Sequence, residues 1–318
     1  MALTDKLTAI ANAIRAKTGG TDQMTLDQMV TEIENISSGS TVEEPYIKET
    51  YDSYGNLIDC EMHGYTLVRA YAFHSCASLN FKSLPSGFTK IENYAFYQCS
   101  SLSLTSLPSS LTYIGSHAFY ECSRLSLTSL PSSLTYIGSN AFERCSSLAL
   151  TSLPSGITTI NSYTFRDCTS LALTSLPSDI TDIYMGAFEG CTKLSLTSLP
   201  SNITSIAYGT FMDCTSLALT SLPSGLTSIG RYAFENCTSL SITSLPNSVV
   251  GIEYYAFKGC TSLTSLTFEM SSCSIDSKAF IDCTNLTTIN VPWAEGAVAN
   301  APWGATNATI NYNYVEGS

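Results

Sequence analysis

The stretch Cys99–Tyr120, CSSLSLTSLPSSLTYIGSHAFY, returns in altered form every 23 residues and decides the fold. Each unit carries a Phe, a Cys three residues after it, and a Leu three residues after the Cys. The Phe column runs from Phe73 to Phe280 through ten units, and Val68 or an Ile stands five residues before each Phe. Such a fixed period is typical of a solenoid, in which each unit buries its apolar face only by stacking on its neighbours.

The composition excludes two classes of partner. Charged residues make up only 13% of the chain, about half the usual share, so Ser and Thr supply most of the solubility. The net charge of −12 repels nucleic-acid phosphate and anionic lipid, and no apolar run is long enough for a membrane span. The N-terminus has no uninterrupted apolar segment typical of a secretory signal. We therefore expect a cytosolically folded protein, unless a signal lies outside this sequence.

Ten of the twelve cysteines form one column of the repeat, from Cys76 to Cys283. Stacked strands lie about 4.8 Å apart, whereas a disulfide needs Cβ atoms about 3.8 Å apart. A regular column therefore disfavours pairing of neighbours and predicts reduced, buried thiols that pack as small hydrophobic groups. The chain has no CxxC motif, so no metal site is expected.

Residues 1–36 lie outside the repeat and read as a small helical segment with a stripe of apolar residues at helical spacing. That stripe consists of Leu3, Leu7, Ile10 and Ile14. Thr25 and Gln28 form a capping box that starts a second helix. Two interpretations stay open: the segment caps the solenoid, or it serves docking or homo-oligomerisation.

Gly, Pro and polar residues mark the remaining boundaries between segments of the chain. Residues 37–45 read as a linker, and residues 46–60 as a hairpin that caps the first repeat. Residues 61–291 are the ten repeats, and residues 292–318 form a C-terminal cap. In that cap we expect two tryptophans to cover the open core and a last strand to lie on the final repeat.

Within one repeat we predict a short strand over Leu102–Pro108, ended by the proline. A short helical or 3₁₀ turn is predicted around Ala118 to Cys122. Strict alternation would leave Leu104 exposed, so we favour a bulge that places it inside with its neighbouring leucines. The last two repeats fit clean alternation.

The unit CxxLxxxxLPxxLxxIGxxAF resembles the 23-residue BspA-type, or treponemal-type, leucine-rich repeat. The resemblance covers about three-quarters of the chain and implies a leucine-rich repeat solenoid with a β-sheet on one face. Leu104 and its equivalents depart from the usual apolar position by one residue. Proteins of this family are mostly surface adhesins and ligand binders.

The two chain ends resemble tail and tail-fibre proteins of phages and prophages of gut Firmicutes. The matching segments are LTDKLTAIANAIRAKTGGTDQMTLDQMVTEIENI and VPWAEGAVANAPWGATNATINYNY. This resemblance implies a virion protein, in which residues 1–36 contact other virion proteins.

No catalytic or cofactor motif is evident. The three histidines fall in different units, and GxSxG, HExxH and phosphate-loop patterns are missing. We therefore expect no enzyme activity, no cofactor and no metal.

The sequence features that indicate binding lie in variable columns rich in tyrosine, a rigid contact residue. The predicted ligand-binding patch consists of Tyr94, Tyr97, Tyr113, His117, Tyr120 and Tyr136.

Two alternatives to this patch stay open. In one, the variation is drift at exposed positions; in the other, the regular Ser and Thr columns form a hydroxyl lattice for sugars or ice. The leading hypothesis is a phage or prophage tail-associated protein that binds a bacterial surface protein or glycan. The alternative is a bacterial cell-surface or secreted adhesin that binds host proteins or glycans.

Overall fold

The computed structural model describes residues 46–55 and 57–315. The predicted helical segment 1–36 and the linker 37–45 lie outside the described residues. The chain divides into two compact units, residues 1–48 with 61–64 and residues 49–60 with 65–318. Residues 65–291 of the repeats belong to the second unit.

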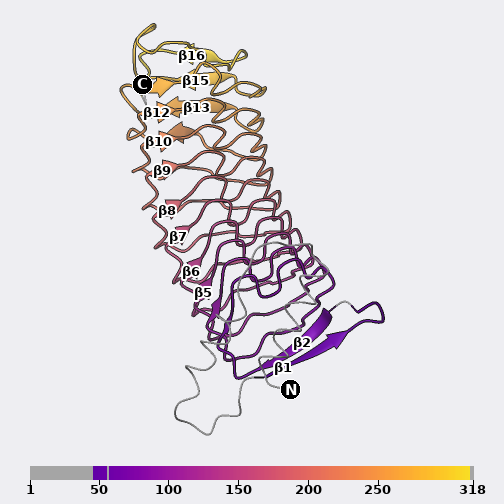
Figure 1. Ribbon diagram of the computed structural model, residues 1–318. Coiled ribbons are helices and arrows are strands. Elements are labelled where there is room, and N and C mark those ends of the chain that lie inside the picture. Colours follow the sequence, from indigo (N-terminus) through magenta and orange to yellow (C-terminus); the bar gives the residue numbers. More distant parts are fainter. Residues whose placement is uncertain (1–45, 56, 316–318) are drawn as a thin grey trace. The chain divides into compact units, whose positions relative to one another are not determined.

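The predicted leucine-rich repeat solenoid is confirmed: successive repeats stack directly on one another (Figure 1). Each repeat contributes a two-residue strand ending at the Val or Ile of the column five before Phe. Neighbouring strands pair in parallel with partners 23 residues apart, as Ile91 with Ile114, except at two points along the column. These strands are β3 (Leu67–Val68), β4 (Lys90–Ile91), β5 (Tyr113–Ile114), β6 (Tyr136–Ile137), β7 (Thr159–Ile160), β8 (Asp182–Ile183), β9 (Ser205–Ile206), β10 (Ser228–Ile229), β12 (Gly251–Ile252) and β14 (Ser274–Ile275).

The strand predicted at Leu102–Pro108 is wrong for the middle repeats. Leu102 and Leu104 are both fully buried, but Thr105 and Ser106 are both exposed. Two consecutive outward residues break the period of two that a strand requires. Burial of Leu104 therefore agrees with our expectation, although there is no strand there to carry a bulge.

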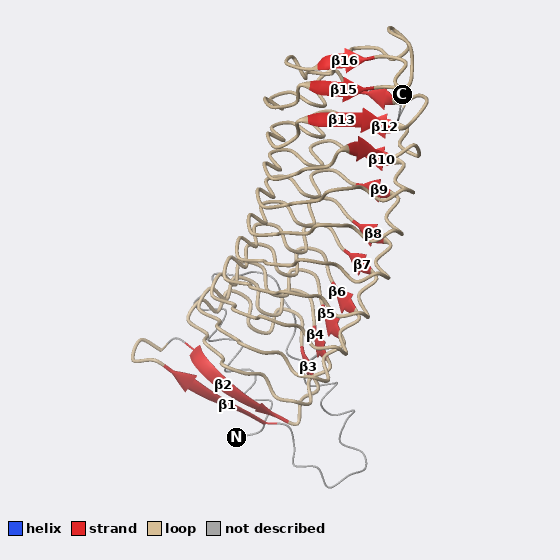
Figure 2. Cartoon of the chain, turned by 180° about the vertical axis from the view of Figure 1, so that it is seen from behind, coloured by secondary structure: helices blue, strands red, loops and turns tan. Residues whose placement is uncertain are grey.

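A second parallel sheet occupies this position only in the last repeats (Figure 2). There Leu266 and Phe268 are buried while Ser265 is exposed and Thr267 half-buried, so the alternation is clean and a strand forms. The strands are β11 (Ser244–Leu245), β13 (Ser265–Phe268), β15 (Thr288–Asn290) and β16 (Thr309–Asn311).

The predicted helical or 3₁₀ turn is also wrong, because the described residues of this segment form successive β-turns. Tyr120 and Cys122 each donate a backbone hydrogen bond to the carbonyl three residues earlier. Between these turns stand His117 and Glu121, whose φ angles are 56° and 57°. A left-handed φ cannot continue a helix. It turns alternate N–H groups toward the next repeat, so that Phe119 donates to the Ala141 carbonyl at 2.8 Å.

The Phe column forms a continuous stack of rings through the centre of the solenoid. From Phe73 to Phe280, consecutive ring centroids lie 5.1–5.7 Å apart and the ring planes are nearly parallel. The nine rings from Phe96 onward are at most 1% exposed. This stack is the largest apolar contribution of each repeat to the core.

The cysteine column packs beside the Phe stack as free thiols. Each thiol from Cys99 to Cys283 donates a hydrogen bond to the carbonyl oxygen of a Phe 26 residues earlier, for example Cys122 to Phe96 at 3.0 Å. That oxygen already accepts the N–H of Cys99 at 3.1 Å. The thiol thus occupies the second lone pair of a buried carbonyl.

The two ends carry different structures. Strands β1 (Tyr46–Tyr51) and β2 (Leu57–His63) form a two-stranded sheet whose turn is closed by a hydrogen bond from Gly55 N–H to the Asp52 carbonyl. At the C-terminal end Trp303 is fully buried and stacks on Phe268, with ring centroids 5.6 Å apart. Strand β16 pairs with β15 beside it.

Candidate binding surface

Two columns of aromatic rings line the turn edge of the first repeats. One column stands two residues before Phe and the other one residue after it. We call these six residues the aromatic comb: Tyr71, Tyr94, His117, His74, Tyr97 and Tyr120. Ring centroids within a column lie 4.6–4.9 Å apart with nearly parallel planes. The two columns approach to 5.6–6.4 Å with tilted planes, so the six rings form one cluster.

The backbone disfavours aromatic residues in the first of these columns. Tyr94 has a φ of 58° and His117 one of 56°, in the left-handed region that costs a residue with a side chain roughly 1–2 kcal/mol. Asn140, Gly186 and Gly209 occupy the same column farther along, and these residue types suit that conformation. Backbone preference therefore does not explain Tyr71, Tyr94 and His117 in this column.

Stacking determines what the comb presents to a partner. Each ring covers the face of its neighbour, so edges and polar tips are what remain accessible. The rings are only partly buried; Tyr71, at the start of its column, is 48% exposed. An aromatic edge carries positive partial charge, whereas the phenolic oxygen accepts and donates hydrogen bonds.

A ladder of polar side chains runs alongside the comb in the column two residues after Phe. Gln98 donates to Glu121 at 2.8 Å, and Arg144 contacts Glu121 at 2.6 Å. Arg144 also donates to the Tyr120 hydroxyl at 3.2 Å and reaches toward Asp167 at 3.7 Å. The charged ladder therefore joins the comb through Arg144.

These surroundings shift the pKa values of the comb. Burial, followed by the charge of Glu121, raises the pKa of the Tyr97 and Tyr120 hydroxyls. Burial lowers the pKa of His117, against the opposing effect of Glu143. The hydroxyls of Tyr97 and Tyr120 are therefore neutral at pH 7, and the neutral imidazole of His117 is favoured. Burial alone would raise the pKa of Glu121, but hydrogen bonds from Arg144 and Gln98 hold it below its usual value.

The structure divides the predicted patch into two groups. Tyr94, Tyr97, His117 and Tyr120 lie together in the comb. Tyr113 and Tyr136 lie on strands β5 and β6 as a separate stacked pair, with ring centroids 4.8 Å apart. The strand carries their side chains outward from a different part of the repeat.

Sequence reasoning left Tyr71, His74 and Arg144 out of the predicted patch. Tyr71 and His74 occupy the two comb columns one repeat earlier, so column position alone could have found them. Arg144 could not be found in this way, because its contact with Tyr120 depends on the left-handed turn.

The described residues outside the comb show no catalytic grouping. Within residues 46–55 and 57–315, no three His, Cys, Asp or Glu side chains gather in a way that could hold a metal ion. Burial raises the pKa of every column thiol, so these cysteines are poor nucleophiles.

The family follows from the repeat. The profile of the BspA type leucine-rich repeat region, six copies long, matches residues 66–195 and residues 181–295. The chain belongs to this family. No curated protein matches it. The predicted family resemblance is thereby confirmed for the repeats.

Several solved structures of leucine-rich repeat proteins resemble the chain. A protein from Bacteroides ovatus aligns with a TM-score of 0.63 and 22% identity, over 86% of this chain and 76% of that one, which shows the fold. A leucine-rich cell surface protein from Faecalibacterium prausnitzii aligns with a TM-score of 0.47 and 21% identity, over 87% and 97%. The T. pallidum leucine-rich repeat protein gives 0.43 and 26%, over 61% and 88%.

The resemblance of the chain ends to tail proteins stays a prediction. Among the residues that the structure describes, no helix has the length and apolar character needed to cross a bilayer.

Proposed function

We propose that this chain is a non-enzymatic binding protein of the bacterial cell surface that recognises a protein partner through the aromatic comb. The observation that carries the proposal is the pair of stacked aromatic columns, the first of which occupies left-handed backbone positions that disfavour aromatic residues. Unfavourable backbone conformations concentrate at functional sites.

Ring orientation favours a protein over a glycan as the partner of the comb. The C–H groups of a sugar pack on the faces of aromatic rings, and here the rings cover one another's faces. Ring edges and hydroxyls beside an arginine are instead the contacts that dominate protein–protein interfaces. Arg144, held against Tyr120, extends the comb with a planar cation.

The proposed location is supported by the family and by the description of the F. prausnitzii protein as a cell surface protein. A tail-associated role, proposed from the two chain ends, places the same binding function on a virion. Tail and baseplate genes beside this one would favour the virion; a signal-bearing or anchored full-length gene would favour the cell surface.

The direct test is the binding of fluorescently labelled protein to cultured epithelial cells and to bacterial cells, measured by flow cytometry. Trypsin treatment of the cells removes surface proteins, and periodate oxidises surface glycans. We expect binding that trypsin abolishes and periodate leaves intact. Binding that is lost only after periodate would contradict a protein partner for the comb.

The regular Ser and Thr columns, here called the hydroxyl columns, are the alternative candidate for the binding surface. Ser106, Ser129 and Ser152 are exposed in successive repeats. Replacing all three by Ala should leave cell binding unchanged, because identical serines offer little discrimination between partners. Loss of binding in this variant would move recognition from the comb to the hydroxyl columns.

A further inference from the structure

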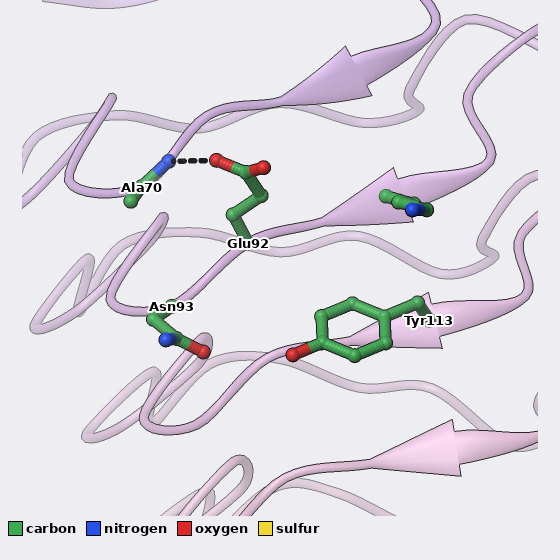
Figure 3. A pocket seen from close by; sticks show the side chains of 5 residues that line it. Ala70, Glu92, Asn93 and Tyr113 are labelled. Atoms are coloured by element: carbon green, nitrogen blue, oxygen red, sulfur yellow. Dashed lines mark hydrogen bonds between the residues drawn. The ribbon is translucent and has the colours of Figure 1, made fainter.

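A pocket of about 450 Å³ opens beside strands β4 and β5. Its lining residues are Ala70, Lys90, Glu92, Asn93 and Tyr113. Its volume lies within the range of small-molecule sites. Figure 3 shows the Tyr113 ring face-on, with its hydroxyl directed toward Asn93.

The pocket contains the end ring of an aromatic stack. Tyr136 stacks on Tyr113 from the following repeat, at 4.8 Å. In the preceding repeat the equivalent strand position is Lys90, which has no ring. Tyr113 therefore ends its stack, and its second face has no aromatic partner among the described residues.

Polar groups with unused hydrogen-bonding capacity surround this ring. One oxygen of Glu92 accepts the Ala70 N–H at 2.9 Å, and the Asn93 side-chain oxygen accepts the Ser116 N–H at 2.8 Å. These two bonds fix both side chains. No described residue hydrogen-bonds to the other Glu92 oxygen, the Asn93 amide nitrogen, the Lys90 ammonium or the Tyr113 hydroxyl.

We propose that this pocket binds one hexopyranose unit of a neutral glycan. The C–H groups on one face of a pyranose carry positive partial charge and pack against the negative face of an aromatic ring. Its hydroxyls both donate and accept, which matches the Glu92 oxygen as acceptor and the Asn93 amide and Lys90 ammonium as donors. The charges of Lys90 and Glu92 balance, so the pocket favours no net charge on the sugar.

The inference stands apart from the protein-binding role of the comb, because none of the pocket residues belongs to the comb. Saturation-transfer NMR would test it on the full chain with the methyl glycosides of glucose, galactose and N-acetylglucosamine. We expect transfer to the sugar ring protons of at least one glycoside, with a Kd in the millimolar range, as ligand efficiency predicts for about a dozen non-hydrogen atoms.

Variants separate the pocket from the rest of the surface. Tyr113→Ser should abolish the transfer, and Lys90→Ala, at an exposed position, should weaken binding about threefold to tenfold. Tyr97→Ser in the comb is the matched control and should leave the transfer intact. No transfer from wild type to any of the three glycosides, or transfer retained in correctly folded Tyr113→Ser, would overturn the proposal. If the protein fails to bind cells but still binds a glycoside, the protein-binding role of the comb is rejected and the sugar site is not.

Discussion

The solenoid stacks aromatic rings inside along the Phe column and outside in the comb, and the inner and outer stacks differ in extent. The inner stack runs through all ten repeats from Phe73 to Phe280. The outer stacks of the comb continue for only three repeats and stop at Asn140 and Glu143. The same 23-residue period sets both ring spacings. The inner positions must stay Phe because each ring needs its neighbours, whereas the outer positions are free to vary and so to specialise.

The largest predicted effect is a loss of stability at alkaline pH, caused by groups that pack beside the inner stack. Burial raises the pKa of the thiols that pack beside the inner stack, such as Cys122 and Cys145. Above the unfolded thiol pKa of about 8.5, the unfolded chain loses protons that the native protein retains, so stability falls as pH rises. Each buried thiol contributes about 1.4 kcal/mol per pH unit in this range. We expect cooperative unfolding by about pH 10, followed by circular dichroism.

Thiol chemistry provides the control for this pH effect. Native protein should react with few equivalents of a thiol reagent at pH 8, and denatured protein with nearly twelve. In a Cys168→Ala variant, the free energy of unfolding should fall less steeply with rising pH, and the difference should equal the contribution of one thiol. Stability that stays constant to pH 10.5 would show that thiolates are tolerated inside, against the burial described above.

Truncating a ring should lower the free energy of unfolding much more in the inner stack than in the comb. Phe142→Ala removes a fully buried ring between two stacked neighbours and should cost about 3–5 kcal/mol in the free energy of unfolding, measured with urea. Tyr120→Ala in the comb should change stability by less than about 0.5 kcal/mol. Equal losses from the two truncations would mean that the comb is part of the core.

A glycine farther along the same column as Tyr94 and His117 predicts a smaller effect. Gly186 has a φ of 59°, and a Cβ atom there would lie 2.3 Å from the ring of Tyr163. The ring can move aside, but the left-handed conformation remains, so Gly186→Ala should cost about 1–2 kcal/mol. Gly251→Ala is the matched control, because no atom lies within 4 Å of its Cβ and its φ is not left-handed. A loss for Gly251→Ala as large as that for Gly186→Ala would contradict this explanation.

The sequence predicts the inner stack almost completely and the outer surface only in part. Invariant columns identify Phe119, Cys122 and Leu125 as core, because burial permits little variation. The residue types of Leu102–Pro108 favour a strand there, whereas the paired strand Tyr113–Ile114 is too short to show a period. The left-handed turn escaped prediction because Tyr and His are rare in that conformation. Without that turn, neither the separation of Tyr113 from the comb nor the contact of Arg144 with Tyr120 can be foreseen.

The most direct test of the division between fold and recognition measures melting and cell binding on the same two variants. Tyr97→Ser/Tyr120→Ser disrupts the comb, and Tyr232→Ser/Tyr255→Ser removes tyrosines of the same turn edge outside it. Both should melt close to wild type, since all four side chains are at least partly exposed. We predict that the first variant loses cell binding by at least about 30-fold, as hot-spot residues worth about 2 kcal/mol require, and that the second retains it. Unchanged binding of the first variant, or equal loss in both, would contradict recognition by the comb.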